Sequence, residues 1–387
     1  MTYATKINNY INKLNNTNVY AIDVETTLIK KDKYKTIFNS PPKFVCFAYN
    51  KVSRDRDDII ISDDSRKLTL AFTKATPVWV GHNIPYDLYI AYNESTDPFS
   101  LMTSVWDTML AEYLLTNQVS RMESLEELCL KYGIEAQKEE EVAQLIKSGV
   151  CPSTIDFDKL KEYLKTDVWM TQCVFKEQYK LFKALPKAWQ VMFINQMIFL
   201  TNTLRASCNG MKIDNVFVDT NKKDLQKQVQ YLQENLMLLM AKYTSTKPSI
   251  WNPSSNSDLS VFLYGGTKKW EERVPNGVYK SGIKAGTTKY KIEKKEIQLK
   301  PHFASRGAVD EAAIKDMLND VHKASGMAAF LTDLLKYKDY SKNLNTYFEG
   351  YMNFQDADGF ISPKFNHGLT PTGRLTCSNP NLQNIKS

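Results

Sequence analysis

The chain has 387 residues, of which 43% are hydrophobic, and this size and composition predict a globular protein with two or three domains. Its formal charge is +7, and no apolar run is long enough to cross a bilayer, which argues against a membrane-spanning protein. The six cysteines are scattered without Cys-x-x-Cys spacing, so neither a zinc knuckle nor a disulfide framework is indicated, and a reducing cytoplasm fits.

The first half of the chain predicts an α/β domain in which a mixed sheet is flanked by helices. A polar helix or arm is expected over residues 1–18. Strands are expected at 19–27, 43–50, 57–62 and 77–80, of which the first three form an antiparallel meander. Helices are expected at 65–74, 84–93, 105–116, 122–133, 138–148 and 156–184.

Past residue 185 the pattern becomes mainly helical. Long helices at 187–208 and 220–243 predict an antiparallel pair joined by an extended link. The segment 264–306 holds 11 basic and 4 acidic residues and so carries the whole net charge, which indicates a polyanionic partner or simply a solvated loop. We expect it to form a mobile or hairpin-like excursion. Shorter elements are expected as helices at 308–319 and 326–347 and a strand at 360–365.

An acidic pair stands at the end of the first predicted strand. Asp23 and Glu25 are two residues apart, so a strand directs both carboxylates to the same side. Two neighbouring carboxylates repel each other, and a hard divalent cation such as Mg²⁺ or Mn²⁺ relieves this repulsion. The pair taken alone is equally compatible with two solvated charges.

Two further clusters follow. Asn83 and Asp87 come directly after the fourth predicted strand, with Asn83 close to a helix N-cap and Asp87 in the first turn. Tyr163 and Asp167 are four residues apart and so lie on one helical face. Each cluster alone is compatible with capping or a solvated stripe, but their joint occurrence in this order favours a single acidic site.

These three clusters resemble the Asp-x-Glu, Asn-x-x-x-Asp and Tyr-x-x-x-Asp motifs of 3′–5′ proofreading exonucleases. The sister subclass carries histidine five residues before the last aspartate, where this chain has Glu162, so the tyrosine subclass is favoured. The resemblance implies a ribonuclease H-like fold with two bound Mg²⁺ or Mn²⁺ ions. By this resemblance, Asp23 would bridge both ions, and Glu25 and Asp167 would complete one site. Asp87 would support the second site through water, and Tyr163 would orient the attacking water.

The resemblance also bears on the DNA strand. We expect His82 and Asn83 to help to hold it near the acidic site.

The end of the chain resembles a second family motif. Residues 372–385 read Thr-Gly-Arg-Leu-Thr-Cys-Ser-Asn-Pro-Asn-Leu-Gln-Asn-Ile, which is similar to a stretch of family A DNA polymerases, with Thr376 and Cys377 replacing two serines and Lys386 a following proline. Residues 252–259 resemble the thumb motif of that family, and 335–344 resemble the helix that leads from thumb to palm. The basic insert is loosely similar to that of phage members.

This second resemblance implies DNA contacts. A thumb would grip the primer–template duplex, Arg374 would reach the minor groove near the primer end, and Gln383 would approach a DNA strand. A surface arginine in a hairpin is the alternative for Arg374. The remaining residues expected to contact DNA are Asn252, Ser255, Lys289, Lys291, Lys294 and Lys295.

The palm motifs that carry the catalytic aspartates of family A polymerases, and the fingers helix, do not occur in this sequence. We therefore expect no nucleotide addition by this chain alone, and a second polypeptide from a split or interrupted gene to supply fingers and palm. A truncated chain is the alternative. A phage gene would place the protein in the cytoplasm of a bacterial host.

The sequence thus predicts three domains: an exonuclease at 1–185, a helical thumb at 186–350 with its insert, and the beginning of a palm at 351–387. The predicted function is two-metal proofreading during DNA replication. The alternatives are a stand-alone 3′–5′ exonuclease acting on DNA or RNA, which the 372–385 stretch disfavours, and a non-catalytic DNA-binding chain, which the acidic set disfavours.

Overall fold

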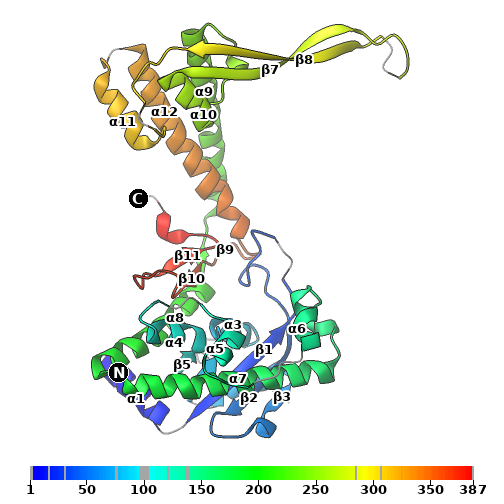
Figure 1. Cartoon of the computed structure of the whole chain (residues 1–387), viewed down its shortest axis with the longest axis vertical. Coiled ribbons are helices and arrows are strands. Elements are labelled where there is room, and N and C mark those ends of the chain that lie inside the picture. Colours follow the sequence, from blue (N-terminus) through cyan, green and yellow to red (C-terminus); the bar gives the residue numbers. More distant parts are fainter. Residues whose placement is uncertain are drawn as a thin grey trace. The chain divides into compact units, whose positions relative to one another are not determined.

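The computed structural model describes most of the chain, and Figure 1 shows its elements. The described residues are 3–15, 18–29, 32–74, 77–95, 104–119, 122–135, 140–283, 286–305, 307–323 and 325–385. Lys386 lies outside these ranges, as do residues 284, 285 and 306 of the basic segment and the start of the helix expected at 138–148. No helix within the ranges is both long and apolar enough to span a membrane.

The chain divides into two compact units. The first contains residues 1–213 and 351–387, and the second contains 214–350. The elements of the first unit are α1 (Tyr3–Asn15), β1 (Val19–Thr26), β2 (Phe44–Lys51), β3 (Ile60–Ser62), α2 (Ser65–Lys74), β4 (Val78–Gly81), α3 (Pro85–Asn93), β5 (Ser104–Asp107), α4 (Thr108–Leu115), α5 (Leu125–Lys131), α6 (Glu140–Lys147), α7 (Phe157–Ala184), α8 (Lys187–Asn209), β6 (Met211–Lys212), β9 (Phe360–Ile361), β10 (Lys364–Asn366) and β11 (Thr376–Ser378).

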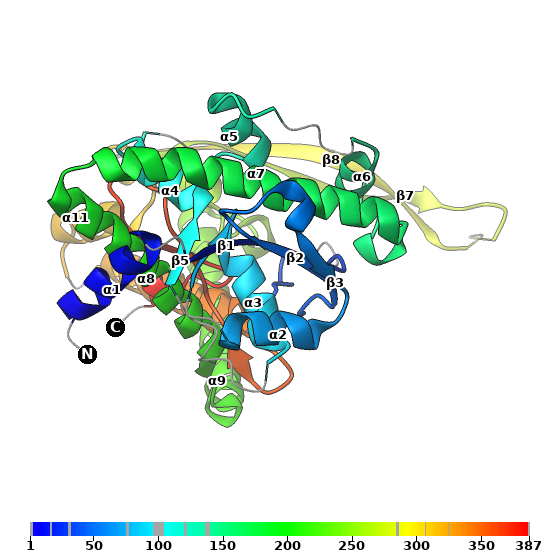
Figure 2. The same cartoon turned by 90° about the horizontal axis from the view of Figure 1, so that it is seen from below.

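A five-stranded mixed sheet organises the first unit. Its strand order is β3-β2-β1-β4-β5, with β1, β2 and β3 antiparallel and β1, β4 and β5 parallel. The predicted meander is therefore confirmed, and so is the mixed sheet. Helix α7 covers one face of the sheet, and α2 and α3 cover the other (Figure 2). Because β1, β4 and β5 are parallel, their carboxyl ends meet at one edge, where the loops after them carry polar side chains.

The prediction of one helix over residues 105–116 was wrong at its start. Residues 104–107 form β5, and the helix α4 begins only at Thr108. Val105 and Trp106 are buried in the sheet, with Trp79 of β4 opposite Val105. Two buried apolar residues are compatible with a helix and with a central strand alike. In the structure these residues form a strand because they pair with β4.

Helix α8 belongs to the first unit. Its side chains Phe193, Ile194 and Met197 lie in the same hydrophobic core as the sheet, whereas Leu232 and Leu236 of α9 lie in the core of the second unit. The expected pairing of these two long helices is therefore wrong, because each buries its apolar stripe in a different core. The first unit also extends past the expected boundary at residue 185, since α8 completes its core.

The C-terminal segment returns to the first unit. β9 pairs with β6, through Met211 and Ile361, and β10 forms a hairpin with β11. The Tyr113 hydroxyl of α4 donates to the Thr370 carbonyl at 2.5 Å, which ties the loop of this hairpin to the N-terminal α/β part of the unit. Residues 351–387 thus fold together with the N-terminal part by direct hydrogen bonds.

The second unit is helical with one hairpin. Its elements are α9 (Asn215–Thr244), α10 (Asn256–Tyr264), β7 (Gly266–Val278), β8 (Thr288–Leu299), α11 (Glu311–Asp320), α12 (Gly326–Lys342) and a π-helical turn at Asn343–Gly350. The helices enclose a core that includes Trp251, Phe262 and Phe330. β7 and β8 are paired over nearly their whole length, so the basic segment is a hairpin, as the sequence analysis expected.

Candidate active site

Three carboxylates converge at the edge of the sheet where the parallel strands end. Oxygen atoms of Asp23, Glu25 and Asp167 all lie within 4.8 Å of one another. Asp23 and Glu25 lie on one face of β1, opposite Ala48 and Cys46 of β2, and α7 packs on this strand and supplies Asp167. The strand period of two and the packing of α7 therefore assemble residues that are more than 140 positions apart in sequence.

This arrangement fits a divalent cation. Oxygen atoms bound to Mg²⁺ at about 2.1 Å lie at most about 4.2 Å apart, so small side-chain movements bring the three carboxylates into range. An oxygen-only set of ligands suits Mg²⁺ or Mn²⁺ better than zinc or copper. The donor chemistry and the spacing both favour a hard cation held by Asp23, Glu25 and Asp167.

Asp87 is the fourth acidic member. Its side chain is 3% exposed in the first turn of α3, and burial raises its pKa well above the usual value, with the Asp23 charge as the second cause. Backbone amides of Val24 and of Asp87 itself donate hydrogen bonds to the carboxylate and partly offset this cost. The electrostatic influence of Asp23 ties Asp87 to the same acidic site.

Tyr163 lies one helical turn before Asp167, as the spacing of four predicts. Both side chains are buried, at 9% and 7% exposure, on the side of α7 that packs against the sheet. The interpretation of this pair as a solvated surface stripe is thereby excluded. The tyrosine hydroxyl and the carboxylate share one face of the helix.

The loop after β4 holds His82 and Asn83. Nδ1 of His82 lies 2.9 Å from the Thr108 hydroxyl, and Asn83 is exposed in the left-handed conformation at φ 62°. Asparagine tolerates this conformation better than most residues. A side chain at Gly81 would approach Ile84 to 2.9 Å, so the strand must end in glycine for the loop to turn tightly.

The sequence analysis missed Asp107 and the Thr26–Tyr86 pair. Asp107 ends β5, is buried, caps α4 and accepts a hydrogen bond from the amide of Ile84, the residue before α3. Burial raises its pKa to about 6. The hydroxyls of Thr26 and Tyr86 lie 2.5 Å apart and join the end of β1 to α3. An aspartate directly before a helix is an N-cap signal, so Asp107 was within reach of sequence reasoning once the helix start was placed correctly.

A cleft opens beside this site within the first unit. It encloses about 1450 Å³ of empty space, part of it open to solvent. Asn83, Tyr86 and Asp107 line one side, and residues 35–38 and 364–367 also contribute to its wall. The C-terminal segment thus helps to form the cleft.

The other residues expected to contact DNA lie elsewhere. Asn252 and Ser255 organise the start of α10, where the Asn252 side chain accepts from Ser254 N at 2.9 Å and the Ser255 hydroxyl from Asp258 N at 3.2 Å. Arg374 and Gln383 are exposed in the C-terminal segment. Their contact with DNA stays a prediction.

The four selected lysines of β8 are all exposed, but they differ in their partners. Lys291 pairs with Glu293 at 2.7 Å, and Lys295 with Glu272 at 2.5 Å. Lys289 and Lys294 form no ion pair within the described residues. Lys291 and Lys295 are therefore partly neutralised by neighbouring carboxylates, while the segment 264–306 as a whole keeps its excess of 11 basic over 4 acidic residues.

Residues 1–177, which contain the mixed sheet and the acidic cluster, match the family described as "3'-5' exonuclease", and this match gives the class of protein. Residues 222–387 match the family "DNA polymerase family A". The chain belongs to the family A DNA polymerases and carries their 3′–5′ exonuclease domain.

Curated relatives agree with this assignment. The chain is 21% identical over 393 aligned positions to DNA polymerase I of Pseudomonas aeruginosa. This alignment covers 97% of this chain and 37% of that protein. It is 23% identical over 284 positions to DNA polymerase I of Synechocystis sp., covering 73% of this chain and 24% of that protein. The chain thus spans between about a quarter and somewhat over a third of the length of these relatives.

A solved structure shows the same fold. The polymerase domain of Pol1 from M. smegmatis, solved in complex with DNA primer-template and dNTP, superposes with a TM-score of 0.58 at 14% identity. The match covers 95% of this chain and 52% of that one.

Proposed function

We propose that the chain hydrolyses DNA from the 3′ end with two divalent metal ions, Mg²⁺ or Mn²⁺, as the proofreading part of a replicative family A polymerase. The observation that carries this proposal is the convergence of Asp23, Glu25 and Asp167, whose oxygens lie within 4.8 Å of one another. A cluster of this kind at a sheet edge, beside an open cleft, is suited to in-line phosphodiester hydrolysis.

Each acidic residue has a role in this proposal. Asp23, Glu25 and Asp167 would hold one ion, and Asp23, with Asp87 acting through water, would hold the second. When bound, such ions supply an activated water at neutral pH and stabilise the charge on the attacking and leaving oxygens. The protein orients the reacting groups: Tyr163, one turn from Asp167 on α7, hydrogen-bonds the attacking water and aligns it with the scissile phosphate.

The cleft takes the single-stranded 3′ end. Its position supports this role, since Asn83 and Tyr86 line it and the Tyr86 hydroxyl is bonded to Thr26, the neighbour of Glu25 in the chain. His82 and Asn83 contribute contacts to the strand from the loop after β4.

We further infer a polymerase setting. The first domain is of the ribonuclease H-like kind, the second unit acts as a thumb that grips the primer–template duplex with Asn252 and Ser255, and residues 351–387 begin the palm, with Arg374 and Gln383 near the primer end. The match of residues 222–387 to DNA polymerase family A supports this setting over a stand-alone exonuclease. Phage origin, host cytoplasm as its location and a second polypeptide for fingers and palm stay predictions.

A double substitution tests the exonuclease proposal. Asp23→Ala together with Glu25→Ala is expected to reduce digestion of a 5′-labelled single strand in Mg²⁺ by at least about 10³-fold, because several kcal/mol of charge stabilisation are lost. EDTA should abolish digestion by the unmodified chain. Asp58→Ala, which removes an exposed carboxylate on the same domain, is the matched control. Undiminished digestion by the double variant would reject the assignment.

A further inference from the structure

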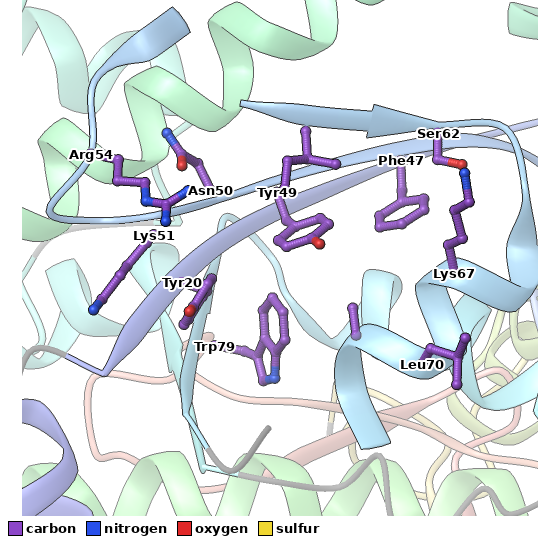
Figure 3. A pocket seen from close by; sticks show the side chains of 12 residues that line it. Tyr20, Phe47, Tyr49, Asn50, Lys51, Arg54, Ser62, Lys67, Leu70 and Trp79 are labelled. Carbon is purple, nitrogen blue, oxygen red and sulfur yellow. The ribbon is translucent and has the colours of Figure 1, made fainter. Parts of the chain in front are cut away.

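A second groove lies on the face of the sheet that carries α2 (Figure 3). It is lined by residues of strands β1 to β4, of the turn after β2 and of helix α2. It encloses about 1070 Å³ of empty space, part of which is open to solvent. This groove has no role in the exonuclease reaction proposed above.

Aromatic rings form its floor. Phe47 and Trp79 are buried, and Tyr20 and Tyr49 are half-buried around them. The ring centroids of Tyr20 and Trp79 are 5.6 Å apart, those of Tyr49 and Trp79 6.2 Å, and Tyr49 stacks on Phe47 at 5.7 Å. Ring faces that border an open groove are platforms on which a nucleobase stacks without regard to its sequence.

Cations lie at both ends of the groove. Lys51 and Arg54 stand at one end in Figure 3 and Lys67 at the other, with the rings between them. None of the residues that line the groove is acidic, and the three cations form no ion pair within the described part of the chain. Asp64, which precedes α2, is held instead by Arg66 at 2.9 Å.

The groove and the acidic site lie on opposite faces of the sheet. Tyr20 is opposite Lys51 and Val24 is opposite Phe47 in the register, so these side chains share the groove face. Asp23 and Glu25 alternate with them and point to the other face. A ligand in the groove therefore does not occupy the position of the strand end that is cut.

We propose that this groove binds a segment of single-stranded DNA outside the exonuclease site, with bases on Tyr20 and Tyr49 and phosphates at Lys51, Arg54 and Lys67. A strand places a phosphate on each side of a stacked base, which matches cations at both ends. A free mononucleotide would use only one end. The choice of DNA rests on the proposed function, whereas the binding itself does not require catalysis.

Photo-crosslinking tests the proposal without catalysis. The full chain with Asp23→Ala and Glu25→Ala is mixed with a short, 3′-blocked oligothymidylate that carries 5-iodouracil, in EDTA, irradiated and mapped by mass spectrometry. Crosslinks are expected at Tyr20 or Tyr49, in addition to the cleft. Lys51→Glu, Arg54→Glu and Lys67→Glu together should remove these crosslinks and weaken binding about tenfold, because phosphate contacts are replaced by repulsion.

The controls separate this groove from general charge effects. A control triple variant changes the net charge by the same amount at exposed positions of the same unit, with the substitutions Lys147→Glu, Lys183→Glu and Lys187→Glu. It should leave the crosslinks unchanged. The single variant Arg54→Gln lies at an exposed turn and should weaken the crosslinks in part. It tests the groove even if the triple variant does not fold.

Three outcomes would overturn the proposal. Crosslinks restricted to the cleft, equal losses in the control triple, or full competition by thymidine monophosphate at the same nucleotide concentration each exclude a strand-binding groove. A chain without exonuclease activity that still gives crosslinks at Tyr20 or Tyr49 would reject the proposed function but retain this site.

Discussion

The carboxylate of Asp107 fixes the position of Ile84. Oδ2 of Asp107 accepts a hydrogen bond from the Ile84 amide at 2.9 Å, and Oδ1 accepts from Leu110 N at 2.9 Å. One buried side chain at the end of β5 thus caps α4 and also holds the amide of Ile84, the residue that directly precedes the helix carrying Asp87. The geometry of the acidic site depends on a residue outside the three exonuclease motifs.

Replacement of this cap should affect both stability and activity. Asp107→Ala leaves two buried amides without their acceptor and is expected to lower the free energy of unfolding by about 2–4 kcal/mol. Exonuclease activity should fall as well, because Asn83 and Asp87 lose their fixed position. Urea unfolding and a digestion assay measure the two effects.

Asp107→Asn serves as the graded comparison, since one amide oxygen replaces two carboxylate oxygens. Asp107→Asn should lower the free energy of unfolding by roughly half as much as Asp107→Ala does. An alanine variant with the stability and activity of the unmodified chain would show that the cap is dispensable.

Asp87 is expected to destabilise the metal-free protein. Burial and the neighbouring Asp23 charge raise its pKa, so the charged form is unfavourable without a cation. Asp87→Asn should therefore raise Tm in EDTA by about 3 °C. It should also reduce the increase in Tm that Mg²⁺ produces, because a ligand that binds only the folded state stabilises in proportion to its affinity.

Differential scanning fluorimetry with and without Mg²⁺ measures both shifts. Asp58→Asn, at an exposed position, should change neither. A lower Tm of the Asp87 variant in EDTA would contradict the electrostatic cost assigned to this carboxyl.

His367 should make the docking of the C-terminal segment sensitive to acid. Its imidazole is buried against Thr203 Oγ1 at 2.8 Å, and burial lowers its pKa to about 4. The unfolded chain keeps the usual value of about 6.5, so it binds the proton more readily. The contribution of neutral His367 to the free energy of unfolding is fully present above pH 6.5. It is lost as the pH falls towards 4, and the loss amounts to about 3 kcal/mol.

Unfolding measured between pH 7 and pH 4 tests this pH dependence. His367→Gln has no group that titrates in this window, so its stability should decline less steeply than that of the unmodified chain. Parallel curves for the two proteins would assign the acid sensitivity to other groups.

The lysines of β8 should contribute unequally to DNA binding. Lys289 and Lys294 have no ion-pair partner in the described part of the hairpin, whereas Lys291 and Lys295 are paired with Glu293 and Glu272. Lys289→Ala with Lys294→Ala should therefore lower the slope of log affinity against log salt by about 1 to 2 if both contact phosphates.

Lys291→Ala with Lys295→Ala is the matched control and should change the slope less, because these charges are already neutralised in part. Fluorescence anisotropy with primer–template DNA at several salt concentrations gives the slopes. Unchanged slopes for both pairs would leave the hairpin as a solvated arm without a role in DNA binding.

The strands and motifs of the first unit were predictable because their signals are local. The alternation around Asp23 fixed β1, and the spacing of four fixed Tyr163 and Asp167 on one face of α7. β5 was not predictable from residues 104–107 alone, because a short apolar run carries no period.

The residue types of the acidic set were determined by the sequence, and so was their order along the chain. Their meeting within 4.8 Å was decided by the tertiary structure, since only the packing of α7 on β1 joins Asp167 to Asp23 and Glu25. The return of residues 351–387 to the first unit was likewise decided by contacts such as Tyr113 with Thr370. Local patterns specify strands, helices and caps, whereas contacts between distant segments depend on which buried surfaces fit together, and no short stretch of sequence contains that information.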